Sequence, residues 1–197
     1  MKRVRVSGHV FLPLVLLMAG CAEKPQTELS EAQQALELAG GAEAGTYAAD
    51  KYEETSLLLR DAEAEIAAQD ARFFAVRNYD RAKEILGRAQ SGASEAKTLA
   101  VTNKDVARKD AEQALNEARQ ALDMALTTLA GAPQGKGTAA DLEALQADLT
   151  SAQSMLGEME ANLYQVGKYL DAVKGFKEVR QRAEMVTAEV QQAIAKR

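Results

Sequence analysis

A long seam of small apolar residues limits what this chain can fold into. From Tyr79 onward, apolar residues recur at alternating steps of three and four, the spacing of one face of an α-helix with a 3.5-residue period. The spacing weakens near Asn103 and then resumes. It predicts either one helix that runs to about Leu129 or two helices with a break at 102–104. The seam consists of Tyr79, Ala82, Leu86, Ala89, Ala93, Ala96, Ala100, Ala107, Ala111, Ala114, Ala118, Ala121 and Ala125.

The C-terminal part predicts two more helices with larger apolar residues. Residues 131–137 are rich in glycine and indicate a linker. Beyond it, apolar residues step by three and four over 142–166 and again over 172–193, and Gly167 is expected to end the first of these helices. Two such helices joined by a tight turn predict an antiparallel coiled-coil hairpin over 138–197.

Two helices are expected before the seam. The first begins near Glu28 and ends in a glycine-rich segment. The second begins at Asp50, which has the capping-box spacing to Glu53. Its apolar face is expected to carry side chains as far as Phe73 and Val76 into the core.

The expected fold class is all-α, an antiparallel bundle of long helices. The chain contains no sustained alternation of period two, which would indicate a strand. We expect an N-terminal helical domain over 28–130, a linker over 131–137 and the C-terminal hairpin over 138–197. Before them, residues 1–20 are expected to be a signal peptide and residues 21–27 a short tether.

The signal is predicted from the first 20 residues. Lys2, Arg3 and Arg5 precede an apolar run of 11 residues from Val10 to Gly20. A membrane-spanning helix needs about 20 such residues. The short run with basic residues before it therefore has the layout of a cleavable export signal.

Cys21 follows this run directly and is the only cysteine. The segment Leu17-Met18-Ala19-Gly20-Cys21 resembles the lipobox of bacterial lipoproteins, although that family usually has leucine where Met18 stands. The resemblance implies that Cys21 carries acyl chains such as palmitate and becomes the first mature residue. Ala22 then implies the outer membrane, in its inner leaflet facing the periplasm. The alternative is an ordinary signal peptide followed by an incidental cysteine.

Composition argues against several chemistries. The single histidine, His9, falls in the signal, so the mature chain offers no Cys/His zinc site, no disulfide and no histidine-activated nucleophile. We expect no metal and no cofactor. Removal of 1–20 takes three of the 24 Lys and Arg and leaves 21 against 29 Asp and Glu, a net charge of −8. This charge argues against a nucleic-acid partner and against a second electrostatic attachment to an anionic membrane.

One spacing recurs three times in the chain. A tyrosine is followed by a small residue three positions on, a large apolar residue after four more, and alanine or valine after three more. The pattern resembles the second helix of tetratricopeptide-like hairpins, although the intervals of 27 and 90 residues differ from the usual period of 34. The three copies are Tyr52-Thr55-Leu59-Ala62, Tyr79-Ala82-Leu86-Ala89 and Tyr169-Ala172-Phe176-Val179.

A family resemblance starts from two segments of this repeat. Tyr47-Ala-Ala-Asp-Lys-Tyr52 and Asn78-Tyr-Asp-Arg-Ala82 resemble small bacterial lipoproteins with an uncharacterised tetratricopeptide-like domain, sometimes placed before an OmpA-type peptidoglycan-binding module. The resemblance covers about 50 residues, from Tyr47 to Ala96, and implies tetratricopeptide-like N-terminal hairpins. It supplies no catalytic residues, and we expect no OmpA-type module after the helices.

The densest aromatic and cationic cluster comprises Arg72, Phe73, Phe74, Arg77 and Tyr79. These residues are the candidate partner-binding site, because helical hairpins bind helices or extended segments in grooves. In the alternative interpretation, Phe73 and Tyr79 belong to the core at a turn between helices and the arginines are solvated.

Two other sets of residues have functional and structural interpretations. Asp61, Glu63 and Glu65 could form a carboxylate set for glycan cleavage, but their alternation along a helix indicates a solvated face. Tyr164 and Tyr169 could contact a glycan or a partner, or pack at the hairpin turn.

The C-terminus invites one further comparison. A small outer-membrane lipoprotein with heptads is linked to peptidoglycan through a terminal lysine. Here the last residue is Arg197 and Lys196 precedes it. Guanidinium stays protonated and is a poor acyl acceptor, so we do not expect this linkage.

These observations predict a lipid-anchored interaction or scaffold protein of the cell envelope, without catalysis. Its expected partners are the membrane, through the lipid, and an unknown envelope protein or peptidoglycan. A structural spacer between outer membrane and cell wall is the first alternative. A cell-wall-active enzyme is the second, and it would need a pocket with converging carboxylates.

Overall fold

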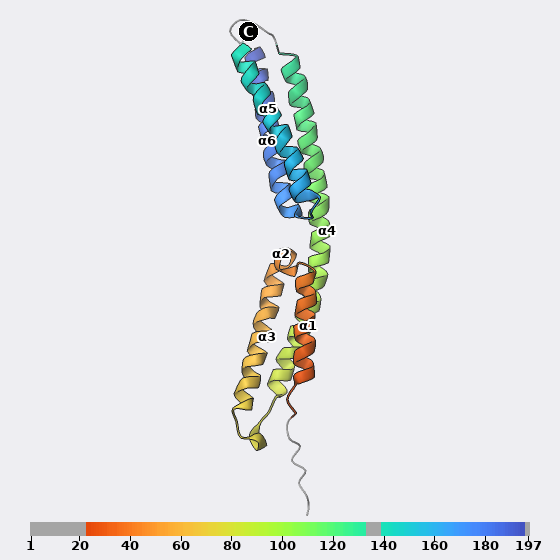
Figure 1. Ribbon diagram of the computed structural model, residues 1–197, viewed down its shortest axis with the longest axis vertical. Helices are drawn as coiled ribbons and strands as arrows, with labels where there is room; N and C mark the ends of the chain where they lie inside the picture. Colours follow the sequence, from red (N-terminus) through yellow and green to blue (C-terminus); the bar gives the residue numbers. More distant parts are fainter. Residues whose placement is uncertain (1–22, 133–138, 196–197) are drawn as a thin grey trace, which may run out of the picture.

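The protein is a rod of packed helices. A computed structural model describes residues 23–132 and 139–195, and every regular element in these ranges is helical (Figure 1). The all-α helical bundle expected from the sequence is therefore confirmed. In chain order the elements are α1 (Gln26–Gly41), α2 (Ala44–Tyr47), α3 (Ala49–Asp70), η1 (Phe74–Val76), α4 (Asp80–Ala130), α5 (Ala139–Met159), η2 (Glu160–Tyr164) and α6 (Tyr169–Ala195).

Helix α4 runs unbroken along the rod. Its 51 residues continue through 102–104, which decides the question that the weak spacing near Asn103 left open. At 1.5 Å per residue the helix is about 76 Å long. Ala121 is partly buried, and the other twelve positions of the predicted seam are buried.

The N-terminal bundle consists of α1, α3 and residues 80–100 of α4. Figure 1 shows α1 rising from the end of the rod where the chain enters, α3 descending beside it, and α4 rising again. Helices α3 and α4 approach closely where Thr55 faces Gly92, since a Cβ at Gly92 would lie 2.6 Å from the Thr55 Oγ1. Thr55 is buried, and its hydroxyl donates a hydrogen bond to the Lys51 carbonyl at 2.7 Å.

The C-terminal bundle consists of residues 111–130 of α4 together with α5 and α6. Its core joins α4 to the hairpin through large side chains such as Leu122, Leu149 and Phe176. Gly167 has a φ of +83°, which glycine adopts without strain, and it ends the turn after α5. The expected linker separates α4 from α5 along the chain, but residues 111–129 share a core with the hairpin rather than with the N-terminal bundle.

The two bundles meet at a polar junction halfway along α4. The Asn103 Nδ2 donates to the carbonyl of Tyr47, the last residue of α2, at 2.7 Å, and the Tyr47 hydroxyl donates to the Gly167 carbonyl at 3.1 Å. Lys104 pairs with Glu43, and its Nζ lies 5.9 Å from the Tyr47 ring centroid. The apolar spacing weakens at this point because Asn103 satisfies a helix-end carbonyl instead of filling a core.

The helix starts are partly as expected. Helix α3 begins one residue before Asp50, whose side chain makes no capping hydrogen bond, so the predicted capping box is wrong. Before α4, the Asn78 Oδ1 accepts a hydrogen bond from the Asp80 N–H at 2.7 Å. Among the described helices, none is both long enough and apolar enough to cross a membrane.

Candidate functional site

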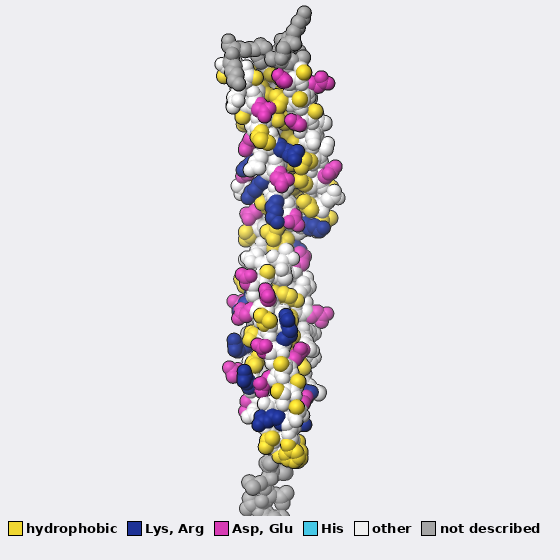
Figure 2. Space-filling view, turned by 90° about the vertical axis from the view of Figure 1, so that its left-hand side faces the viewer, with side chains coloured by type: hydrophobic (Ala, Val, Ile, Leu, Met, Phe, Trp, Pro, Cys, Tyr) yellow, Lys and Arg dark blue, Asp and Glu magenta, His cyan; other side chains and the backbone are white. Residues whose placement is uncertain are grey.

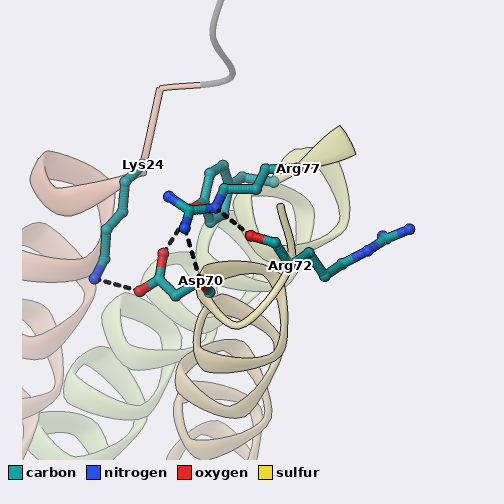
Figure 3. Close-up of polar contacts among 5 residues, drawn as sticks. Lys24, Asp70, Arg72 and Arg77 are labelled. Carbon is teal, nitrogen blue, oxygen red and sulfur yellow. Dashed lines mark hydrogen bonds and ion pairs between the residues drawn. The ribbon is translucent and has the colours of Figure 1, made fainter. Parts of the chain in front are cut away.

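The candidate partner-binding residues lie in a loop at one end of the rod. Helix α3 ends at Asp70, so the prediction that Phe73 and Val76 continue its buried face is wrong. The Arg77 side chain closes the loop: its Nη2 donates to the Asp70 carbonyl at 2.8 Å and its Nε to the Arg72 carbonyl at 3.0 Å (Figure 3). A cation that satisfies carbonyls at a helix C-terminus stabilises that end. We call residues 71–79 the tip loop.

Asp70 joins the tip loop to the start of the chain. Its carboxylate accepts hydrogen bonds from the Lys24 Nζ at 2.7 Å and from the Tyr79 hydroxyl at 2.6 Å. These two donors, Lys24 first, hold the pKa of Asp70 below its ordinary value, and the carboxylate in turn raises the pKa of Tyr79. Figure 3 shows Lys24 and Arg77 on either side of Asp70, while the Arg72 side chain extends away from it.

Helix α1 includes the last two residues of the segment 21–27 that was expected to be a tether. Helix α1 begins at Gln26, Pro25 is buried and Lys24 is held by Asp70. Glu23, which precedes them, is exposed. The first described residues therefore already pack at the end of the bundle.

The tip loop separates its aromatic residues into two environments. Tyr79 is buried with 3% of its surface exposed, as the alternative interpretation expected. Phe73 is 68%, Phe74 57% and Val76 55% exposed, so the part of that interpretation that placed Phe73 in the core is wrong. The Phe73 and Phe74 rings contact each other with centroids 4.5 Å apart. Figure 2 shows hydrophobic side chains gathered at this end of the rod.

A shallow groove of about 370 Å³ runs between α4 and α6 in the C-terminal bundle. Its centre is lined by Ala121 and Met124. At one end Arg180 lies 2.6 Å from Glu117 and 3.4 Å from Glu184, measured between nitrogen and carboxylate oxygen. Hydrogen bonding from Gln113 and the nearby Arg180 lower the pKa of Glu117. A general acid for glycan cleavage needs the opposite shift.

The three carboxylates considered for glycan cleavage do not converge. Asp61 and Glu63 are exposed on α3, and Glu63 accepts a hydrogen bond from Gln33 at 2.9 Å. Glu65 pairs with Arg81 across the bundle at 3.9 Å. None of the three lines the groove between α4 and α6.

The remaining candidate residues fall into two groups. One group packs against the core, and the other lies outside the residues that the structure describes. Tyr164 and Tyr169 are partly buried against the C-terminal core, with ring centroids 5.7 Å apart. Cys21, Lys196 and Arg197 lie outside the described residues.

Sequence reasoning missed the polar contacts that hold these sites. Lys24 and Asp70 are 46 residues apart, and Glu117 and Arg180 are 63 apart. Their pairing depends on which helices are neighbours and on their relative register, so no local motif marks them. Asn103 is different, since the gap that it makes in the alanine seam did mark its position.

Residues 23–132 and 139–195 contain no group of three or more His, Cys, Asp or Glu arranged to hold a metal ion. Comparisons with protein-family models, with curated proteins and with solved structures found no match.

Proposed function

We propose that this chain is a lipid-anchored scaffold of the bacterial cell envelope, without catalysis, attached through Cys21 and facing the periplasm from the outer membrane. The rod would hold its C-terminal bundle away from the membrane, where it is accessible to an envelope protein or to peptidoglycan. The anchor would also raise the effective concentration of the bundle for such a partner.

One observation supports this proposal above the others: the two described ends of the chain lie at opposite ends of the rod. The start of α1 and the tip loop lie at one end of the rod, while α6 finishes at the other end, beside the C-terminal end of α4 (Figure 1). An anchor before Glu23 therefore places the far end of the C-terminal bundle about 76 Å of helix away from it.

The anchor is tested by metabolic labelling. Cells that express the full chain are fed an alkyne-bearing palmitate, and the chain is then captured and examined. We expect label on the wild type, none on Cys21→Ala, and recovery of the wild type with the outer-membrane fraction. An unlabelled wild-type chain would contradict the anchor.

The scaffold role is tested by photocrosslinking in cells. A photoreactive residue is placed at Met124 in the groove between α4 and α6, and a matched one at exposed Leu57 in the N-terminal bundle. We expect discrete crosslinks to an envelope protein or to peptidoglycan from the position at 124, and fewer from 57. Absence of crosslinks from both positions would argue against a scaffold.

The elongated shape also favours the spacer as a second candidate. Its test is the distance between outer membrane and cell wall, measured by electron cryotomography in cells with and without the gene. A spacer predicts that the distance between outer membrane and cell wall is changed or more variable in the deletion strain. A scaffold predicts that this distance is unchanged and that position 124 crosslinks to a partner.

A further inference from the structure

The tip loop exposes apolar side chains that the fold does not use. Phe73, Phe74 and Val76 are 68%, 57% and 55% exposed, and Phe73 has the largest exposed fraction among the large apolar side chains that the structure describes. The loop is held by backbone and polar contacts from Arg77, Asn78 and their partners, not by these three side chains. Contiguous exposed apolar residues on a soluble domain mark a contact with a partner or a membrane.

The position of the tip loop favours contact with a membrane over contact with a protein partner. Through Asp70 the tip loop is bonded to Lys24, so it lies beside the first described residues of the chain. Cys21 precedes Glu23 by two residues, and two residues of extended chain cover at most about 7 Å. If Cys21 carries the lipid, as in the proposed function on which this step rests, the bilayer surface lies within reach of the tip loop.

The charges of the loop fit the surface of a phospholipid bilayer. Residues 71–79 contain Arg72 and Arg77 and no acid, whereas the mature chain as a whole is acidic. The neighbouring acid, Asp70, is paired with Lys24, and Asp80 follows the loop at the start of α4. Arginines beside aromatic side chains are typical of segments that bind at the headgroup level, where the cations meet anionic lipid.

We propose that the tip loop inserts Phe73, Phe74 and Val76 into the boundary between headgroups and acyl chains of the bilayer that carries the chain. The contact gives the rod a second point of attachment besides the lipid. Two points of attachment restrict the tilt of the rod, which a single acylated residue leaves free. The net charge of the chain argues against an electrostatic attachment to an anionic membrane, whereas this contact depends on the apolar side chains and arginines of the tip loop alone.

Fluorescence offers a direct test because the chain has no tryptophan. The full chain carrying Phe74→Trp is purified in detergent and reconstituted into vesicles of phosphatidylethanolamine and phosphatidylglycerol, with or without brominated acyl chains. We expect a blue-shifted emission that loses most of its intensity when the acyl chains are brominated. Met124→Trp, at a 62% exposed position in the C-terminal bundle, is the matched control and should keep its emission.

A second variant separates insertion from mere proximity. Phe73→Asp in the Phe74→Trp background should remain on the vesicles through its acyl group but lose the blue shift and the quenching. Circular dichroism checks that helicity is unchanged, as expected for an exposed position. Fluorescence that is unquenched in Phe74→Trp, or quenched equally in Met124→Trp, overturns the proposal. So does a blue shift that needs envelope proteins instead of lipid, since the occupant is then a protein.

This experiment distinguishes a failure of the proposed lipid anchor from a failure of the proposed insertion of the tip loop. The mass of the purified chain reports acylation, whereas quenching reports insertion. An acylated chain without quenching removes the tip contact and leaves the anchor. A chain without acyl groups that is still quenched when added to the same vesicles removes the anchor and leaves the tip contact.

Discussion

The two bundles of the rod are stabilised by different kinds of packing. The core of the N-terminal bundle has eight buried residues, four of them alanine and four larger, including Leu59, Ile66 and Leu86. The core of the C-terminal bundle has 17 buried residues, and beside eight alanines it buries nine larger side chains, including Leu149, Phe176 and Val190. Each buried methylene contributes about 0.8 kcal/mol, so the C-terminal bundle derives more of its stability from buried area.

Small residues stabilise the N-terminal bundle in another way. Alanine and glycine let two backbones approach, as at Gly92 and Thr55, and close approach leaves no space for a larger side chain. The comparison predicts that truncation costs most in the C-terminal bundle, whereas the contact with Thr55 makes the N-terminal bundle sensitive to enlargement at Gly92. The predictions below test this contrast, from the largest effect to the smallest.

Phe176→Ala should have the largest effect. Phe176 is fully buried at the centre of the C-terminal core, and its truncation should lower the free energy of unfolding by about 3–5 kcal/mol. Hydrogen exchange should show loss of protection in α5 and α6 before α1 and α3. Met185→Ala, at an exposed position on α6, is the control and should change little. Equal loss of protection in both bundles would contradict the contrast.

Thr102→Pro should uncouple the bundles. Thr102 is exposed at the junction, so the variant affects the backbone of α4 and little else; it should cost about 3 kcal/mol. Unfolding should then occur in two transitions, and the transition at lower temperature should belong to the N-terminal bundle. Thermal unfolding followed by circular dichroism measures this, with Thr102→Ala as control. A single transition in the proline variant would show that the bundles are coupled without a continuous helix.

Gly92→Ala tests enlargement. The added methyl group would meet the Thr55 hydroxyl, which is fixed by its bond to Lys51, so we expect a loss of about 1–3 kcal/mol. Gly157→Ala on α5 is the matched control, since its Cβ would meet nothing within 4 Å. The control should be neutral or stabilising by about 0.5–1 kcal/mol, because glycine is unfavourable inside a helix. Chemical denaturation compares the two variants, and a smaller loss at 92 than at 157 would be contrary to expectation.

Asp70→Asn should have the smallest effect, and one that depends on pH. The pKa of Asp70 is lowered in the folded chain, so its ionised form stabilises the fold fully above its ordinary pKa of about 4. This contribution is lost as the pH falls through the lowered value. The unfolding midpoints of wild type and variant should therefore differ at pH 7 and converge on acidification. Asp61→Asn, on the exposed face of α3, is the control; a constant difference at all pH values would refute this account.

The sequence predicted much of the helical core because one face of each helix repeats regularly. In each of the three copies of the tyrosine repeat, the three positions that follow the tyrosine are buried, from Thr55 in the first copy to Val179 in the last. The spacing could not predict how the helices divide into cores, because a continuous seam looks the same whether one bundle or two pack along it. Only the gap at Asn103 indicated a boundary between two cores. The reason for the gap is the hydrogen bond from Asn103 to the Tyr47 carbonyl, which the sequence does not reveal.

The tip loop could be found from sequence but its structure could not. The cluster from Arg72 to Tyr79 was identified by its composition. The end of α3 was missed because Arg77, a residue beyond the helix, satisfies its terminal carbonyls. Whether Phe73 is buried or exposed then depends on where the loop turns. The local spacing of apolar residues does not predict the position of that turn.

The path of α4 through both bundles has a mechanical consequence. A pull between Glu23 and Ala195 acts along the axes of α1, α4 and α6, so it loads the packed faces in shear over their whole length instead of peeling one helix from the next. The rate of unfolding governs survival under force. A rod joined by one unbroken helix should therefore transmit tension along its axis without first separating into two halves.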